Sequence, residues 1–265
     1  MRLVQLFVHP VKSMRGNAIA QWSVEAQGMT DDRRWMVVDA RNRFVTGRQV
    51  PAISRCLALV TDNGLRLEHD GSVFDVDTPA TDHSVDVVVW SDTVRAHDAG
   101  DGVADWLSAQ FGRALRLVWQ ADPRSRPLAE SRRATPDDVV SFADGYPLLA
   151  MTTASLEELN GRLEVPVTAR NFRPNLVIET QTAFEEDDWH TIDVGGVPFR
   201  VISPCSRCVF TTVDPATGAK RADREPLATL SGYRRDADTG KILFGVNLIP
   251  LETGRIGVGC AVSLK

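Results

Sequence analysis

Short runs of β-branched and alternating apolar residues follow one another through the first hundred residues of the chain. They include RLVQLFVH (2–9), RRWMVVDA (33–40), RFVTGR (43–48) and VDVVVW (85–90). Turn signals separate the runs, most clearly Asn63-Gly64 and Asp70-Gly71, and such dipeptides favour the tight turns of β-hairpins. The pattern therefore predicts antiparallel sheet in the form of a barrel or sandwich.

Helical spacing is confined to three segments of the sequence. Residues 101–112 place four apolar side chains on one face and end at a glycine, which is a common stop signal. Residues 152–163 carry leucines on one stripe after Thr153 or Ser155, and either residue suits a helix N-cap. A third helix is predicted to begin near Pro226, because proline is favoured in the first turn.

Between the first two helices lies a polar stretch, residues 120–138, that contains three prolines and is predicted to be a surface loop or an inter-domain connection. Strand patterns resume beyond it, including CVFTTV at 208–213. The length of 265 residues accommodates two β-rich units, each with a core. The fold class predicted is mainly β with a few helices, and two domains are expected over residues 1–120 and 121–265.

Charge and hydropathy limit the possible functions. The formal net charge of -5 lacks the positive footprint that binding to a nucleic acid polymer requires. The apolar run in the first ten residues is too short for a signal peptide or a membrane span, and no longer one follows. We therefore expect a cytoplasmic protein that does not bind membranes, with reduced cysteines.

Cations nevertheless recur in short, turn-like motifs beside proline, glycine, serine or asparagine. Guanidinium groups fit the oxygens of phosphate bidentately. Together these loop cations therefore favour a small anionic ligand over a macromolecular one. They are Lys12, Arg15, Arg33, Arg34, Arg48, Arg170, Arg173 and Arg207.

Two of the four cysteines, Cys205 and Cys208, stand three positions apart in VISPCSRCVFTT (201–212). A structural zinc site is weakly supported, because Cys56 and Cys260 are isolated and no closely spaced histidine pair exists. A redox dithiol is disfavoured because the residues that follow predict a strand and not a helix.

In an extended segment, positions three apart point to opposite faces, so only one of the two thiols is expected to face a pocket. A single thiolate beside an arginine suits a metal centre that brings most of its own ligands. The alternative is that both cysteines are small, buried apolar residues.

Several strings, in one order along nearly the whole chain, resemble those of MOSC domain proteins with an N-terminal MOSC β-barrel. Within that family the chain is similar to the mitochondrial amidoxime-reducing component and to bacterial reductases of N-hydroxylated bases. The strings are HPVKSMRG, DRRW, FVTGRQVP, NFRPNLVIE, EEDDWHTIDVG, PCSRCVFTTVDPATG, EPLATLSGYR and LFGVNLIP.

The resemblance implies a MOSC N-terminal β-barrel-like domain over residues 1–120 and a MOSC β-barrel domain over residues 121–265. It also implies a molybdenum-dependent oxidoreductase that removes oxygen from amidoximes, hydroxylamines or N-hydroxylated nucleobases. The cofactor implied is Mo-molybdopterin, with Cys208 as the metal ligand and catalytic residue and Cys205 as its structural partner.

Cofactor contacts carry over to positions that match the family strings: Lys12, Ser13, Arg33, Arg173, Asn175, Ser206, Arg207 and Asn247. Thr152 is added because it stands at a predicted helix start, where an anion is stabilised. The chain ends soon after the last predicted strand, so electrons are expected from a separate donor of ferredoxin or cytochrome/flavoprotein type. Two alternatives remain: a sulfur carrier with a persulfide on Cys208, and a non-catalytic module that binds the cofactor.

Overall fold

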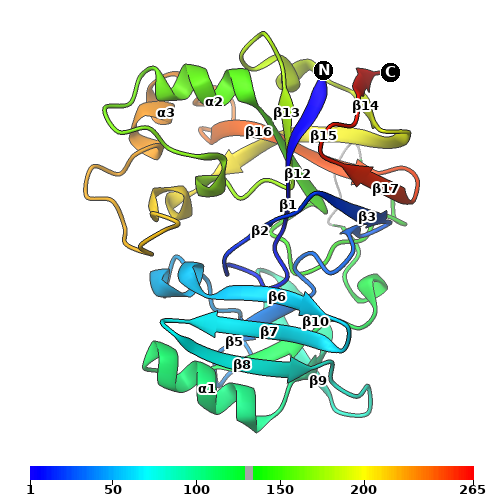
Figure 1. Cartoon of the computed structure of the whole chain (residues 1–265), viewed down its shortest axis with the longest axis vertical. Helices are drawn as coiled ribbons and strands as arrows, with labels where there is room; N and C mark the ends of the chain where they lie inside the picture. The colour runs from blue at the N-terminus through cyan, green and yellow to red at the C-terminus, as the bar shows by residue number, and fades with distance from the viewer. Residues whose placement is uncertain (129–133) are drawn as a thin grey trace.

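The computed structural model describes residues 1–128 and 134–265 and confirms a mainly β fold (Figure 1). One part of the molecule is built on an eight-stranded sheet with two short helices, α2 (Thr153–Asn160) and α3 (Leu227–Tyr233), beside it. In order, this sheet contains β18 (Val262–Leu264), β14 (Thr191–Val194), β15 (Val197–Arg207), β16 (Ile242–Pro250), β12 (Leu148–Thr152), β13 (Leu176–Glu179), β1 (Arg2–Val8) and β2 (Asn17–Ala18).

Three smaller sheets complete the described fold. One contains β17 (Gly254–Gly257), β3 (Gln21–Glu25) and β4 (Gly28–Met29). The second contains β5 (Trp35–Val38), β11 (Arg116–Trp119), β10 (Asp92–Asp98) and β9 (Ser84–Val89). The third contains β6 (Leu57–Thr61), β7 (Gly64–His69) and β8 (Ser72–Asp77), and helix α1 (Asp101–Phe111) lies at this end of the molecule (Figure 1).

Local sequence signals account for the elements at this end. In β7, Leu65 and Leu67 are buried while the alternate Arg66 is exposed, as expected of a strand with one face on the core. Asp70 and Gly71 join β7 to β8 with φ angles of 45° and 81°, and positive values at both positions define the hairpin turn that such a pair favours.

Helix α1 also forms as predicted. Val103 and Leu107 are buried in the core formed with Leu65 and Trp35. The helix ends at Gly112, whose left-handed φ of 67° lets its N–H bond back to the carbonyl of Ser108.

Three local predictions are wrong. Residues 208–213 do not continue as a strand, because β15 ends at Arg207 and a 3₁₀ helix, η5 (Val209–Thr212), follows. The expected strand at 43–48 contributes only two isolated bridges, from Phe44 to Val38 and from Arg43 to Val88. The N-cap of α2 is Thr152 and not Thr153 or Ser155, since the Thr152 side chain accepts the N–H of Ser155.

The polar stretch 120–138 lies partly outside the described residues. Within its described part, Pro123–Ser125 form a 3₁₀ turn, and residue Pro127 bridges to Val139. No helix in residues 1–128 or 134–265 has the length and apolar character needed to cross a membrane.

The first strand of the chain lies among strands from the C-terminal half. In the antiparallel pair of β1 and β13, Arg2 lies opposite Glu179 and Leu6 opposite Leu176. The chain then leaves this sheet, forms the smaller sheets around α1 and returns at β12 (Figure 1). Segments from both ends of the sequence are thereby brought together, and the division at residues 120 and 121 stays a prediction.

Candidate functional site

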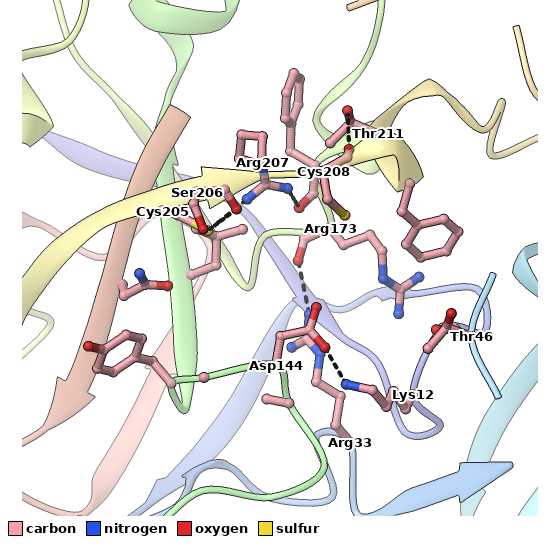
Figure 2. A pocket seen from close by; sticks show the side chains of 18 of the residues that line it. Lys12, Arg33, Thr46, Asp144, Arg173, Cys205, Ser206, Arg207, Cys208 and Thr211 are labelled. Carbon is pink, nitrogen blue, oxygen red and sulfur yellow. Dashed lines mark hydrogen bonds and ion pairs between the residues drawn. The ribbon is translucent and has the colours of Figure 1, made fainter. Parts of the chain in front are cut away.

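A cavity of about 380 Å³ combines segments that are far apart in the sequence (Figure 2). They come from the loop after β1, the approach to β5, the turns near Arg48 and Trp90, the loop before β12, and the end of β15. Five cationic side chains and one carboxylate, that of Asp144, line it, so an anion is favoured there. The cations are Lys12, Arg33, Arg48, Arg173 and Arg207.

Backbone strain concentrates at this cavity. Ser13, Arg33 and Arg173 have positive φ angles of 68°, 52° and 56°. Such conformations in residues other than glycine cost about 1–3 kcal/mol each and persist where the surroundings enforce them, often at functional sites. Here they lie at three lining positions on separate loops.

Arg33 connects the N-terminal and C-terminal segments. Its guanidinium donates to Oδ1 of Asn175 at 3.1 Å and to the carbonyl of Arg173 at 3.0 Å, and it forms an ion pair with buried Asp32. The amide of Asn175 donates in turn to the carbonyl of Phe7 at 3.2 Å. These contacts fix Arg33 and Asn175 in the cavity wall.

Two other arginines keep free donors. Nη2 of Arg173 and Nε of Arg207 are buried and have no hydrogen-bond partner among the described residues. Burial, followed by the charge of Arg33, lowers the pKa of Arg173 to about 9. A bound anion would supply acceptors for these donors and relieve the repulsion between the guanidinium groups.

Lys12 and Asp144 form an ion pair at the cavity (Figure 2). The buried ammonium of Lys12 also donates to the carbonyl of Phe142 at 2.7 Å. Burial lowers the pKa of Lys12 to about 8, although Asp144 opposes the shift. The surrounding protein removes part of the hydration of Asp144, which opposes its ionisation, but the charge of Lys12 outweighs this and holds the pKa of the carboxyl well below its usual range.

Both thiols of the Cys205 and Cys208 pair line the cavity, so the prediction that only one would face it is wrong. The pairing register of β15 shifts between Pro204 and Ser206, which breaks the strict alternation of faces. Cys208 is exposed, and its Sγ lies 3.7 Å from Nη1 of Arg48. Sγ of Cys205 instead accepts a hydrogen bond of 2.9 Å from Arg207.

Within the described ranges, no three His, Cys, Asp or Glu side chains gather as a set of metal ligands. A metal bound through Cys208 would therefore need ligands from a cofactor.

The structure brings nine of the ten predicted site residues to the cavity. They are Lys12, Ser13, Arg33, Arg173, Asn175, Ser206, Arg207, Cys208 and Asn247. Thr152 is not among the lining residues. Its side chain has no accessible surface and lies 2.9 Å from Oε2 of Glu186, so it completes the buried start of α2 instead of meeting an anion.

Sequence reasoning missed several lining residues. Trp90, Asp144 and Tyr146 were not singled out, and Arg48 was noted only as a loop cation. Trp90 lies under the guanidinium of Arg48 at 4.6 Å and donates to Asp144 at 3.3 Å. The turn-like DGYP at 144–147 was the available signal for this part of the wall.

Comparison with known proteins shows the family to which this chain belongs. The MOSC N-terminal beta barrel domain matches residues 1–114, and the MOSC domain matches residues 137–263. The mitochondrial amidoxime-reducing component 1 of Homo sapiens is 33% identical over 281 residues, which cover 99% of this chain and 82% of the relative. The chain belongs to the MOSC family.

Other relatives support the assignment of this chain to the MOSC family. The Danio rerio mitochondrial amidoxime-reducing component 1 is 35% identical over 97% of the chain and 82% of the relative. The Homo sapiens mitochondrial amidoxime reducing component 2 is 31% identical over 97% and 81%, respectively. These matches confirm the resemblance and the predicted fold class, with MOSC N-terminal and MOSC domains.

Proposed function

We propose that this MOSC protein is a molybdenum cofactor-dependent reductase that removes oxygen from N-hydroxylated substrates such as amidoximes, hydroxylamines and N-hydroxylated nucleobases. Its relatives are named for the reduction of amidoximes. The observation that carries the proposal is the exposed thiol of Cys208 in a cavity with five cations. Soft thiolate ligation and phosphate recognition are the two properties that such a cofactor requires.

The residues present fit Mo-molybdopterin. Its terminal phosphate would be held by Lys12, Arg33 and Arg173, and the free Nη2 of Arg173 is a donor without another partner in the described chain. Arg207 offers a second free donor, Nε, to the pterin. Neutral donors and acceptors would come from Ser13, Asn175, Ser206 and Asn247.

When bound, the cofactor supplies the two-electron chemistry that removes oxygen from an N–O bond. Cys208 would bind the metal as a thiolate, and Nη1 of Arg48 lies 3.7 Å from its Sγ. Asp144 stays ionised, so it would accept a hydrogen bond from a substrate N–H and not act as a proton donor. Trp90, which packs against the guanidinium of Arg48 at 4.6 Å, would contact an amidine-type substrate with the exposed part of its ring.

Electrons would come from a separate donor protein of ferredoxin or cytochrome/flavoprotein type. The cytoplasmic location, and the division into domains at 1–120 and 121–265, are parts of the same proposal. They follow from the sequence expectations above.

Metal and pterin analysis of the freshly purified protein tests the function. We expect about one molybdenum per chain and turnover of an amidoxime with a chemical reductant. Cyanide-labile sulfur without molybdenum would instead indicate a sulfur carrier with a persulfide on Cys208. Molybdenum without any turnover would indicate a non-catalytic binding module.

The two cysteines provide a matched pair of variants. Cys208→Ala should abolish turnover, because the proposed metal ligand is lost, whereas Cys205→Ala should keep measurable turnover and mainly lower the free energy of unfolding. Retained activity in Cys208→Ala, with loss in a folded Cys205→Ala protein, would contradict the assignment.

A further inference from the structure

A second cavity, of about 450 Å³, adjoins the first. Arg173, Asn171 and Phe210 line both cavities and form the wall that they share. The guanidinium carbon of Arg173 lies 5.6 Å from the centre of the Phe210 ring. The second cavity is otherwise lined by residues that have no part in the function proposed above.

The second cavity is cationic. Arg15, Arg170 and Arg221 line it together with Arg173, and the only carboxylate in its lining is that of Asp214. Oδ1 of Asp214 already accepts the N–H groups of Ala216 and Thr217 at 2.8 and 2.9 Å. One oxygen of this carboxylate is therefore engaged by its own turn, and the four arginines outnumber its single negative charge.

Two of these arginines lack a counter-charge. Arg15 and Arg170 form no ion pair within residues 1–128 and 134–265, whereas Arg221 is paired with Asp223. Burial, followed by the charge of Arg15, lowers the pKa of Arg170. Two guanidinium groups that repel each other and have no carboxylate between them form a receptor for a doubly charged oxyanion.

His9 does not contribute to the positive charge of this cavity. It is buried at the same cavity, and burial, followed by the charge of Arg33, lowers its pKa to about 3. The ring is therefore neutral at physiological pH. The positive charge of the cavity comes from its arginines.

One part of the cavity wall is apolar. The guanidinium of Arg170 lies 5.1 Å from the centre of the Phe7 ring and donates to the carbonyl of Gly16 at 2.8 Å. These contacts hold the guanidinium in place beside an apolar surface. Val167, Pro174 and Val213 extend that surface.

We propose that this second cavity is a binding site for a small organic phosphate with a flat apolar body. The phosphate would meet Arg15 and Arg170, and the apolar body would lie against the surface around Phe7. The volume accommodates a ligand of this size, since small-molecule sites span roughly 300–1,000 Å³.

Calorimetric titration of the purified full chain with phenyl phosphate tests the site. We expect saturable binding that Arg170→Gln and Arg15→Gln each weaken about tenfold or more, which is the effect of losing one charge-assisted hydrogen bond. Arg66→Gln, which removes an exposed arginine on β7, should bind as the native protein does. Inorganic phosphate should bind about tenfold more weakly, because it lacks the apolar body.

Lys12→Met distinguishes the two cavities, because Lys12 lines only the first. Native-like binding of phenyl phosphate by this variant supports the second cavity as the site. The proposal is overturned if no saturable binding occurs, if both arginine variants bind normally, or if Lys12→Met alone loses binding. Arg15 is exposed, so Arg15→Gln remains informative should Arg170→Gln fail to fold.

Discussion

Replacement of Lys12 by methionine tests whether this buried cation serves a ligand or the fold. Burial lowers the pKa of Lys12 from 10.5 to about 8, and one pKa unit corresponds to about 1.4 kcal/mol. Holding the ammonium charged in the folded protein therefore costs about 3 kcal/mol at neutral pH. Methionine removes that cost but leaves the carbonyl of Phe142 without its donor, which costs about 1–3 kcal/mol.

The gain from removing the buried charge and the loss of the donor to Phe142 nearly cancel. Asp144 adds little to the cost, because its side chain is 63% exposed and water solvates it when Lys12 is absent. We expect the free energy of unfolding of Lys12→Met to lie within about 2 kcal/mol of the native value in urea titrations. Cofactor retention should weaken by about tenfold to a hundredfold, the effect of losing one charge-assisted hydrogen bond to phosphate. Molybdenum content by mass spectrometry measures that loss.

Arg126→Met is the matched control, because Arg126 is equally buried but is not among the residues that line the first cavity. Its guanidinium pairs with Asp92 at 2.9 Å and donates to the carbonyls of Ser141 and Ala143. Because Arg126→Met removes this pair and also leaves two carbonyls without their donor, we expect it to cost about 2–5 kcal/mol. A Lys12→Met protein that loses as much stability as Arg126→Met, yet keeps its full molybdenum, would refute the reasoning.

The same pKa shift predicts a pH dependence. Below about pH 8, Lys12 is protonated in both the folded and the unfolded state, and the free energy of unfolding is lowered by the full cost of burying the ammonium. Between about pH 8 and 10.5 the folded state loses the proton first, so this group makes the protein more stable as the pH rises. This rise in the free energy of unfolding should be absent in Lys12→Met. Identical pH profiles of stability in the native protein and the variant would contradict the lowered pKa of Lys12.

Two further predictions concern His9 and Gly47. Burial lowers the pKa of His9 from 6.5 to about 3, so the unfolded state binds a proton first as the pH falls below 6.5. By pH 5 this effect should lower the free energy of unfolding by about 2 kcal/mol. Urea titrations of His9→Gln should lack this part of the decline. A Cβ on Gly47 would lie 2.1 Å from the Phe210 ring, so Gly47→Ala should displace the wall between the cavities, cost about 1–3 kcal/mol and lower molybdenum content. Gly232→Ala, with no atom within 4 Å of the added Cβ, is its control, and equal molybdenum content in both variants would contradict the clash.

Much of the fold could be predicted because its signals are local. Helix α1 combines a periodic apolar face with a glycine that adopts the left-handed conformation at its end. The strand expected at 208–213 failed because another local interaction prevailed over β-branched propensity. The hydroxyls of Thr211 and Thr212 donate to the carbonyls of Cys208 and Val209 at 2.9 and 2.8 Å, which favours the 3₁₀ turn.

Residues of the candidate site that lie in strings shared with the family could be predicted from the sequence. Residues that reach the site only through tertiary contacts could not. Arg34 illustrates the difference, because it was noted among the loop cations but donates to the carbonyls of Gln120 and Ala121 within the fold. Trp90 and Asp144 meet across 54 positions of sequence, a contact that no spacing rule reveals. Each of the remaining loop arginines lines one of the two cavities, except Arg173, which lines both.

The pairing of β1 with β13 has a consequence for synthesis of the chain. Arg2 leaves the ribosome well before its partner Glu179, which lies 177 positions later in the chain. At translation rates of about 5–20 residues per second, the first strand waits roughly 10–35 s for its neighbour. Leu3 and Leu6, which are buried in the finished protein, remain uncovered by β13 throughout that interval. We therefore expect β1 to be a site of aggregation in nascent chains, and shielding of this strand by chaperones to protect them.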